Sequence, residues 1–205
     1  MDEARQVRDF WFGKLPMTAQ ALNQRLSLWF PGDLSEASLR TRDDVIRKRF
    51  GNLVERAGKG ELAGWADSPR RCLSLIVVLD QFPRNIYRGT AKAFAHDDLA
   101  LELTLSGMQS AADGALDVVE RIFFYMPLQH CEARDVQDES VAAYRRLLAE
   151  APQEFHGVFA SWVQSAVQHR SIIERFGRFP HRNEVLGRRS TPDEEAWLDS
   201  QPEGI

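Results

Sequence analysis

The chain has 205 residues, of which 43% are apolar and 27% are charged, and its formal net charge is −4. This composition is typical of a soluble globular protein, and it excludes collagen-like, low-complexity and wholly disordered chains. Two cysteines exclude a disulfide scaffold, and the small negative charge gives no general attraction to nucleic acid or to an anionic membrane.

Apolar residues recur at helical spacing along nearly the whole chain, and Gly or Pro stands at most of the expected helix ends. Hairpin signals such as Asn-Gly between alternating apolar runs are absent. The fold class expected is therefore all-α, with about eight to ten helices and residues 1–205 in a single domain. In chain order, the predicted helices cover 3–12, 18–30, 41–58, 70–82, 97–111, 116–125, 132–150, 152–176 and a short stretch after Thr191.

The run CLSLIVVLDQF in 70–82 is compatible with a buried strand or a buried helix. Helix is favoured because the other segments have helical period.

Three helix limits, among them the end of the 70–82 helix, are predicted from single residues. Pro83 is expected to end this helix, and Pro127 is expected to end the helix over 116–125. Asp97 is expected to cap the start of 97–111.

One phrase occurs twice, as DQFPRNIYRG in residues 80–89 and as FGRFPHRNEVLGR in residues 176–188. Both copies contain Phe-Pro, then Arg-Asn, then an apolar pair, then a Gly close to an Arg. The Pro predicts a helix corner, where backbone N–H groups are free and an Arg side chain is available. Between His169 and Arg189, six arginines stand against two glutamates.

Two interpretations of these corners stay open. In the first, each Arg bonds exposed carbonyl groups and the corners are purely structural. In the second, the two corners face one cleft and hold an anion. The candidate ligand-binding residues are then Arg84, Asn85, Arg88, Arg178, His181, Arg182 and Asn183.

The phrases FWFG, LWF, LDQFPRNIYRG, FAHD, FFYMPLQHCE and FGRFPHRNEVLGRRST span almost the whole chain. In these phrases and their order, the sequence resembles the bacterial family catalogued as domain of unknown function 924. The resemblance implies an all-helical fold similar to tetratricopeptide-repeat superhelices, and it implies no activity. The chain itself shows no sustained 34-residue repeat, so a peptide-binding repeat array does not follow from it.

Four titratable residues next to apolar segments are candidates for general acid–base catalysis, namely Asp80, His130, Glu132 and His169. His169 lies on an apolar stripe, which is more typical of a core histidine than of a catalytic one. The five histidines are scattered without metal-ligand spacing, so no metal site is predicted. Phosphate-loop and dinucleotide-binding glycine patterns are absent, and no cofactor is predicted.

Three functions remain open from the sequence. The first is a binding module that holds a small anionic molecule or an acidic peptide group in an Arg-lined cleft. The second is a structural or protein-interaction scaffold with a buried polar network, and the third is a hydrolase-like enzyme. The N-terminus is charged from Asp2 onward, and apolar runs such as 75–79 are far shorter than the roughly 20 residues of a membrane helix, so a cytoplasmic location without a membrane partner is expected. The oligomeric state stays open.

Overall fold

The computed structural model describes residues 2–30, 32 and 35–201, and within these ranges every regular element is a helix. The expected all-α fold is confirmed. The α-helices are α1 (Glu3–Phe12), α2 (Ala19–Trp29), α3 (Glu36–Gly58), α4 (Pro69–Ile76), α5 (Phe82–Ile86), α6 (Asp97–Gln109), α7 (Val118–Phe124), α8 (Met126–His130), α9 (Arg134–Glu150), α10 (His156–Phe176) and α11 (Pro192–Ser200).

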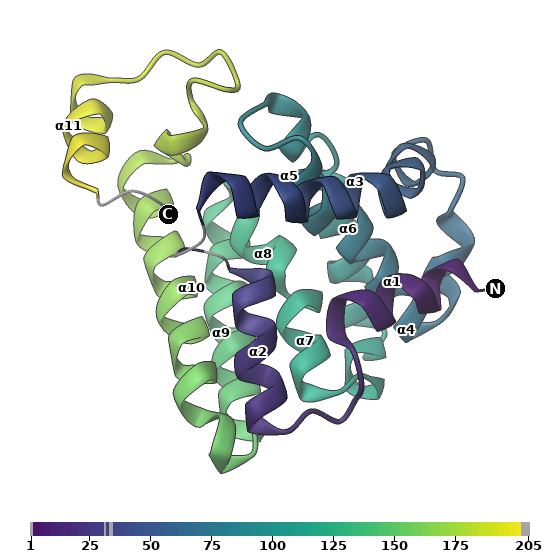
Figure 1. The fold of residues 1–205 in the computed structure, drawn as a ribbon. Helices are drawn as coiled ribbons and strands as arrows, with labels where there is room; N and C mark the ends of the chain where they lie inside the picture. Colours follow the sequence, from purple (N-terminus) through teal and green to yellow (C-terminus); the bar gives the residue numbers. More distant parts are fainter. Residues whose placement is uncertain (1, 31, 33–34, 202–205) are drawn as a thin grey trace.

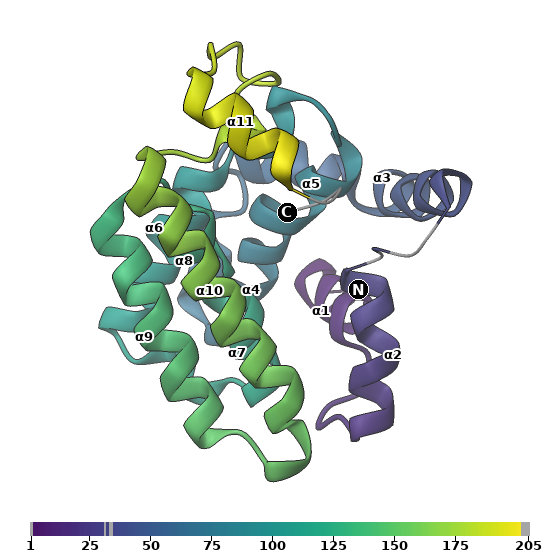
Figure 2. The ribbon, with the colours of Figure 1, turned by 90° about the vertical axis from the view of Figure 1, so that its left-hand side faces the viewer.

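The two long helices α9 and α10 lie side by side and run in opposite directions (Figures 1 and 2). The helices α1 to α3 lie on the other side of the molecule, and the shorter helices α4 to α8 fill the space between (Figure 2). The segment from α10 to α11 folds over the end of the molecule at which α10 finishes (Figure 1). This last segment carries the second copy of the repeated phrase.

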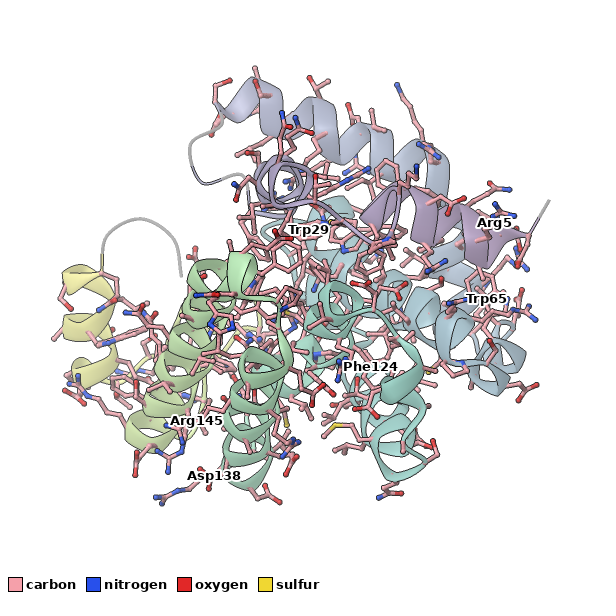
Figure 3. All side chains as sticks on the ribbon, turned by 90° about the horizontal axis from the view of Figure 1, so that it is seen from below. Arg5, Trp29, Trp65, Phe124, Asp138 and Arg145 are labelled. Atoms are coloured by element: carbon pink, nitrogen blue, oxygen red, sulfur yellow. The ribbon has the colours of Figure 1, made fainter. Side chains whose placement is uncertain are left out.

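Aromatic side chains from distant parts of the chain form the centre of the core. The ring of Phe123 on α7 lies 4.6 Å from that of Trp29 and 5.5 Å from that of Trp11, both in edge-on geometry. Such pairs stabilise a core beyond the apolar area that they bury. Figure 3 shows Trp29 and Phe124 among packed side chains, with Arg5 and Asp138 toward the outside.

Local capping signals decide several helix ends as the sequence predicts. The hydroxyl of Thr18 accepts the N–H of Ala21 at 3.2 Å and begins α2. Gly177 has a φ of +70°, a left-handed conformation that favours glycine, and it ends α10. The side chain of Thr191 and that of Glu194 form a reciprocal capping box at the start of α11.

Of the two prolines expected to end helices, Pro127 stands where a helix ends and Pro83 does not. Residues 77–81 form a wide π turn that joins α4 to α5, so the helix continues past Pro83 to Ile86. A proline removes one N–H and crowds the carbonyl group one turn earlier. The π turn absorbs both effects, because its hydrogen bonds reach one residue further. At the second proline, α7 ends at Phe124 as expected, and Pro127 lies in the first turn of a new helix, α8.

The expected cap at Asp97 is also wrong. His96 occupies the capping position of α6 and makes no side-chain capping bond, while Asp97 is the first residue of the helix. The Asp97 carboxylate is instead bonded to Arg84, a residue of the first corner. The Asp97 carboxylate therefore links α6 to α5 instead of capping α6.

Candidate functional site

The two corners border one cavity of about 400 Å³, which we call the arginine cavity. Its walls come from α5 and the turn after it, the 91–94 turn, α8, α10, the 180–182 turn and the residue that follows α2. The lining residues are Phe30, Arg84, Arg88, Gly89, Ala93, Phe94, Met126, Gln129, His130, Trp162, Ser165, His169, His181 and Arg182. Three arginines and three histidines line it, and no described lining residue is an Asp or a Glu.

Asp80 lies in the π turn beneath the cavity and is completely buried. One of its carboxylate oxygens lies 3.1 Å from the Arg84 guanidinium and 2.7 Å from Nδ1 of His130. Burial alone would raise the pKa of Asp80, but the charges of Arg84 and His130 hold it well below its usual range. Asp80 is therefore ionised and can only accept hydrogen bonds.

Arg84 joins the first corner to the start of α6. Its guanidinium donates two parallel hydrogen bonds of 2.8 Å to the two oxygens of Asp97, and a further one of 2.6 Å to the backbone oxygen of Asp80. This fork geometry is specific to arginine. Arg84 thus lines the arginine cavity while most of its donors are engaged within the fold.

His130 ends α8 and lines the arginine cavity. Because the ionised Asp80 can only accept, Nδ1 of His130 carries the proton of their shared hydrogen bond. Burial and the charge of Arg84 lower the pKa of His130 despite the nearby Asp80. The neutral ring then has a free lone pair on Nε2, which can accept a proton or a hydrogen bond from a molecule in the cavity.

Arg182, from the second corner, is the most buried arginine of the cavity, with 7% of its surface exposed. Its guanidinium lies over the rings of Phe94 and Phe179, 4.7 Å and 4.6 Å from their centres. Its nearest carboxylate oxygen, on Asp97, is 3.5 Å away. Burial and the charge of Arg84 lower the pKa of Arg182 to about 10, so this cation is only partly compensated.

Three side chains of the cavity wall each hold a buried N–H group that has no hydrogen-bond partner among the described residues. These groups are Nε2 of Gln129, Nε1 of Trp162 and Nε of Arg182. Unpaired buried donors are rare in folded proteins, because each costs about 1–3 kcal/mol. The wall of the arginine cavity is therefore rich in donors and poor in acceptors.

His169 also lines the cavity, from α10, as the sequence analysis considered. Its Nδ1 lies 2.8 Å from the backbone oxygen of Ser165, which can only accept, so Nδ1 carries a proton. Burial lowers the pKa of His169, and the charges of Arg182 and Arg84 act in the same direction. At neutral pH this histidine is uncharged.

The remaining residues of the first corner form a second ion-paired group. Arg88 lines the cavity with its side chain half-exposed, and its Nε donates to Asp43 at 2.9 Å. Asn85 is not part of the cavity wall. It accepts from Arg42 at 2.5 Å and donates to the backbone oxygen of Gln81.

Two candidate ligand residues of the second corner lie away from the cavity and bond within the C-terminal segment. Arg178 forms a two-pronged bond with the buried Glu194, at 2.7 and 2.8 Å. Asn183 donates to Ser190 and to the same Glu194. These contacts match the structural interpretation of a corner. His181 and Arg182 are the residues of this corner that reach the cavity.

The four acid–base candidates do not share one place. His130 and His169 line the arginine cavity and the buried Asp80 bonds His130 from within the fold, whereas Glu132 holds the C-terminal segment. The Glu132 carboxylate accepts the backbone N–H of Phe179 at 2.8 Å and pairs with Arg188 at 2.7 Å. It lines a neighbouring hollow of about 250 Å³, which shares Phe94, His130 and Arg182 with the arginine cavity.

Sequence reasoning did not single out Gln129, Phe94 or Trp162 as candidate site residues. Trp162 is 8% exposed and does pack in the core, yet it also forms part of the cavity wall. No local pattern distinguishes such a residue from any other buried aromatic. No group of three or more His, Cys, Asp or Glu in the described part of the chain is arranged to hold a metal ion.

The profile of the bacterial proteins of unknown function named DUF924 matches residues 7–202. The chain belongs to the DUF924 family. Its structure is similar to that of a protein of unknown function, ATU0120, from Agrobacterium tumefaciens, with 32% identity, a TM-score of 0.78 and 97% of each chain covered. No curated protein matches this DUF924 chain. Within the described residues, no helix has the length and apolar character needed to cross a membrane. The expected likeness to tetratricopeptide-repeat superhelices stays a prediction.

Proposed function

We propose that this DUF924 protein binds a small anionic molecule in the arginine cavity. The observation that carries the proposal is the composition of the wall, which joins three arginines and three histidines without a carboxylate among its described residues. Anions are recognised by such convergent donors in a partly closed, low-dielectric site. The unpaired N–H groups of Gln129, Trp162 and Arg182 support the same conclusion, because they add to the excess of donors in the wall.

Arg182 is the residue on which the proposal rests most directly. Arg84 and Arg88 are committed to Asp97 and Asp43, whereas within the described part of the chain Arg182 keeps an unpaired N–H and has no carboxylate closer than 3.5 Å. A buried cation with so little compensation costs stability. Residues that cost stability in this way are typical of binding and active sites.

Replacing Arg182 with Met tests the proposal. We expect the variant to fold with nearly unchanged stability, since it loses a poorly paired buried charge, and to bind no anions. Wild-type protein is screened by thermal shift against inorganic phosphate, methanesulfonate, benzoate and an acidic dipeptide, in chloride-free buffer. A ligand at 100 times its Kd adds about 2.7 kcal/mol, which for this size raises Tm by roughly 5–10 °C.

Arg178→Met is the matched control, because this arginine belongs to the same corner but bonds Glu194 outside the cavity. It should lower Tm and leave the anion-induced shift intact. A screen without any shift, or a shift that survives in Arg182→Met, contradicts the proposal. The first of these results would favour a structural or protein-interaction role for the polar corners.

Anion affinity should rise as pH falls from 7 to 5. Free His130 and His169 have lowered pKa values and are neutral at pH 7. A bound anion favours their charged forms, so the complex takes up protons that the free protein does not. By linkage, affinity then increases on acidification, by up to about tenfold per pH unit for each proton taken up. Calorimetric titration with methanesulfonate measures this, because that probe keeps its charge throughout. An affinity that is flat with pH would exclude both histidines from the anion site.

A further inference from the structure

A groove continues from the arginine cavity between α2 and α10. It has a volume of about 420 Å³ and is lined by Leu26, Ser27, Phe30, Ser161, Trp162 and Ser165. Phe30, Trp162 and Ser165 belong to the walls of both hollows. The cavity and the groove therefore meet along these three side chains, and one elongated ligand can occupy both.

The groove differs from the cavity in its chemistry. None of its described lining residues carries a charge. Leu26, Phe30 and Trp162 supply apolar surface, and the aromatic rings of the last two lie 4.8 Å apart. Phe30 is 45% exposed, an unusual position for a large apolar side chain beside a charged cavity. Covering it with an apolar group would be favourable.

Among the described residues, the ion-paired shell around the cavity has one uncompensated positive charge. The shell consists of the arginines Arg42, Arg84, Arg88 and Arg182 and of the aspartates Asp43, Asp80 and Asp97. At neutral pH its histidine, His130, is uncharged. A ligand with a single negative charge balances this shell, whereas a dianion would exceed it.

We propose that the ligand is an amphiphilic monoanion of the straight-chain monocarboxylate class. Its carboxylate lies near Arg182 in the arginine cavity, and its alkyl chain extends past Phe30 and Trp162 into the groove. This inference rests on the proposed function, because the cavity must bind the anionic head. It adds the charge of the head and the apolar nature of the rest of the molecule.

Calorimetric titration with the series from butanoate to decanoate tests the inference at pH 7. For each methylene that enters the groove, affinity should increase about fourfold, which corresponds to about 0.8 kcal/mol. Inorganic phosphate should bind more weakly than octanoate. Decyltrimethylammonium, which has an apolar chain and the opposite charge, should not bind.

The double variant Ser27→Asp/Ser161→Asp tests the position of the chain, because both serines are exposed and line opposite walls of the groove. Charged walls stay hydrated and cannot cover an alkyl chain. Decanoate affinity should fall at least about tenfold and butanoate affinity should not change. The control Ser27→Asn/Ser161→Asn has nearly the same shape without the charges and should retain most of the gain with chain length.

The outcomes separate this inference from the proposed function. If butanoate and phosphate bind but affinity does not increase with chain length, the inference is overturned and the anion site stands. If decyltrimethylammonium binds as tightly as decanoate, the proposal of a monoanionic ligand is overturned. It is also overturned if phosphate binds more tightly than every monocarboxylate. If no anion binds at all, the proposed function itself fails.

Discussion

Replacing Asp80 with Ala should lower the free energy of unfolding by about 3–5 kcal/mol, because it leaves a largely buried guanidinium without one of its two carboxylate partners. Asp80 is fully buried, and it accepts bonds from Arg84, His130 and Gln81. The substitution also leaves Nδ1–H of His130 without its acceptor. The protein should therefore lose stability and the fixed orientation of His130 together.

Asp80→Asn is the control that keeps the shape. Its amide oxygen can still accept from His130, so the loss should be smaller than that of the alanine variant. Urea unfolding followed by tryptophan fluorescence measures both losses. If Asp80→Ala costs less than about 1 kcal/mol, the carboxylate is not the centre of the network described above.

Because Asp80 is ionised, the free energy of unfolding also depends on pH. Comparing wild type with Asp80→Asn measures this dependence. Its folded pKa is lowered, so the folded protein holds fewer protons on this group than the unfolded chain does. The resulting stability is fully present above the unfolded pKa of about 4 and is lost as pH falls toward the folded value. Asp80→Asn lacks this contribution, so its free energy of unfolding should fall less than that of wild type between pH 5 and 3. This pH range brackets the usual pKa of an aspartate, about 4.

Replacing Gln137 with Leu should lower the free energy of unfolding by about 3 kcal/mol, the second-largest loss that we expect. Gln137 is fully buried on α9, and its Nε2 bonds the backbone oxygens of Leu128, Gln129 and Cys131, at 3.2, 2.8 and 2.7 Å. The Leu128 oxygen also accepts the backbone N–H of Cys131 at 3.4 Å, whereas the last carbonyl groups of a helix have no following turn to bond them. A leucine would remove the side-chain donor from the Gln129 and Cys131 oxygens.

Gln168→Leu on α10 is the matched control, because Gln168 is exposed and the same substitution there should cost less than about 0.5 kcal/mol. The bonds of Gln137 also flank His130 along the chain, so its loss should weaken anion binding as well as the fold. Urea unfolding and a methanesulfonate titration measure the two effects. Equal losses in both variants would contradict the capping role of Gln137.

Helix ends with local signals follow directly from the sequence. Thr18, Gly177 and the pair Thr191 and Glu194 act on backbone groups within about one turn, so neighbouring residues suffice to predict them. The same local rule is wrong at Pro83. The π turn there is compatible with the chain because Asp80 and the apolar residues around it are held by distant partners.

The repeated phrase shows how far the sequence reaches toward the site. The two copies identify the corners, but they do not distinguish Arg182, which lies in the cavity wall, from Arg178, which bonds Glu194. Nor do they distinguish Arg84 from Asn85, which points to Arg42 on α3. The partners of Arg178 and Asn85 lie 16 and 43 residues away in the chain.

Because helix period and capping act over a few residues, the all-helical class, most helix limits and the charged corner residues follow from the amino-acid sequence. Which of those corner residues share a cavity depends on how distant segments pack. Arg84 and Arg182 reach it from corners almost a hundred residues apart, and both meet Asp97 there. Ion pairs and cavity walls form between segments whose distance in the chain carries no information about their distance in space.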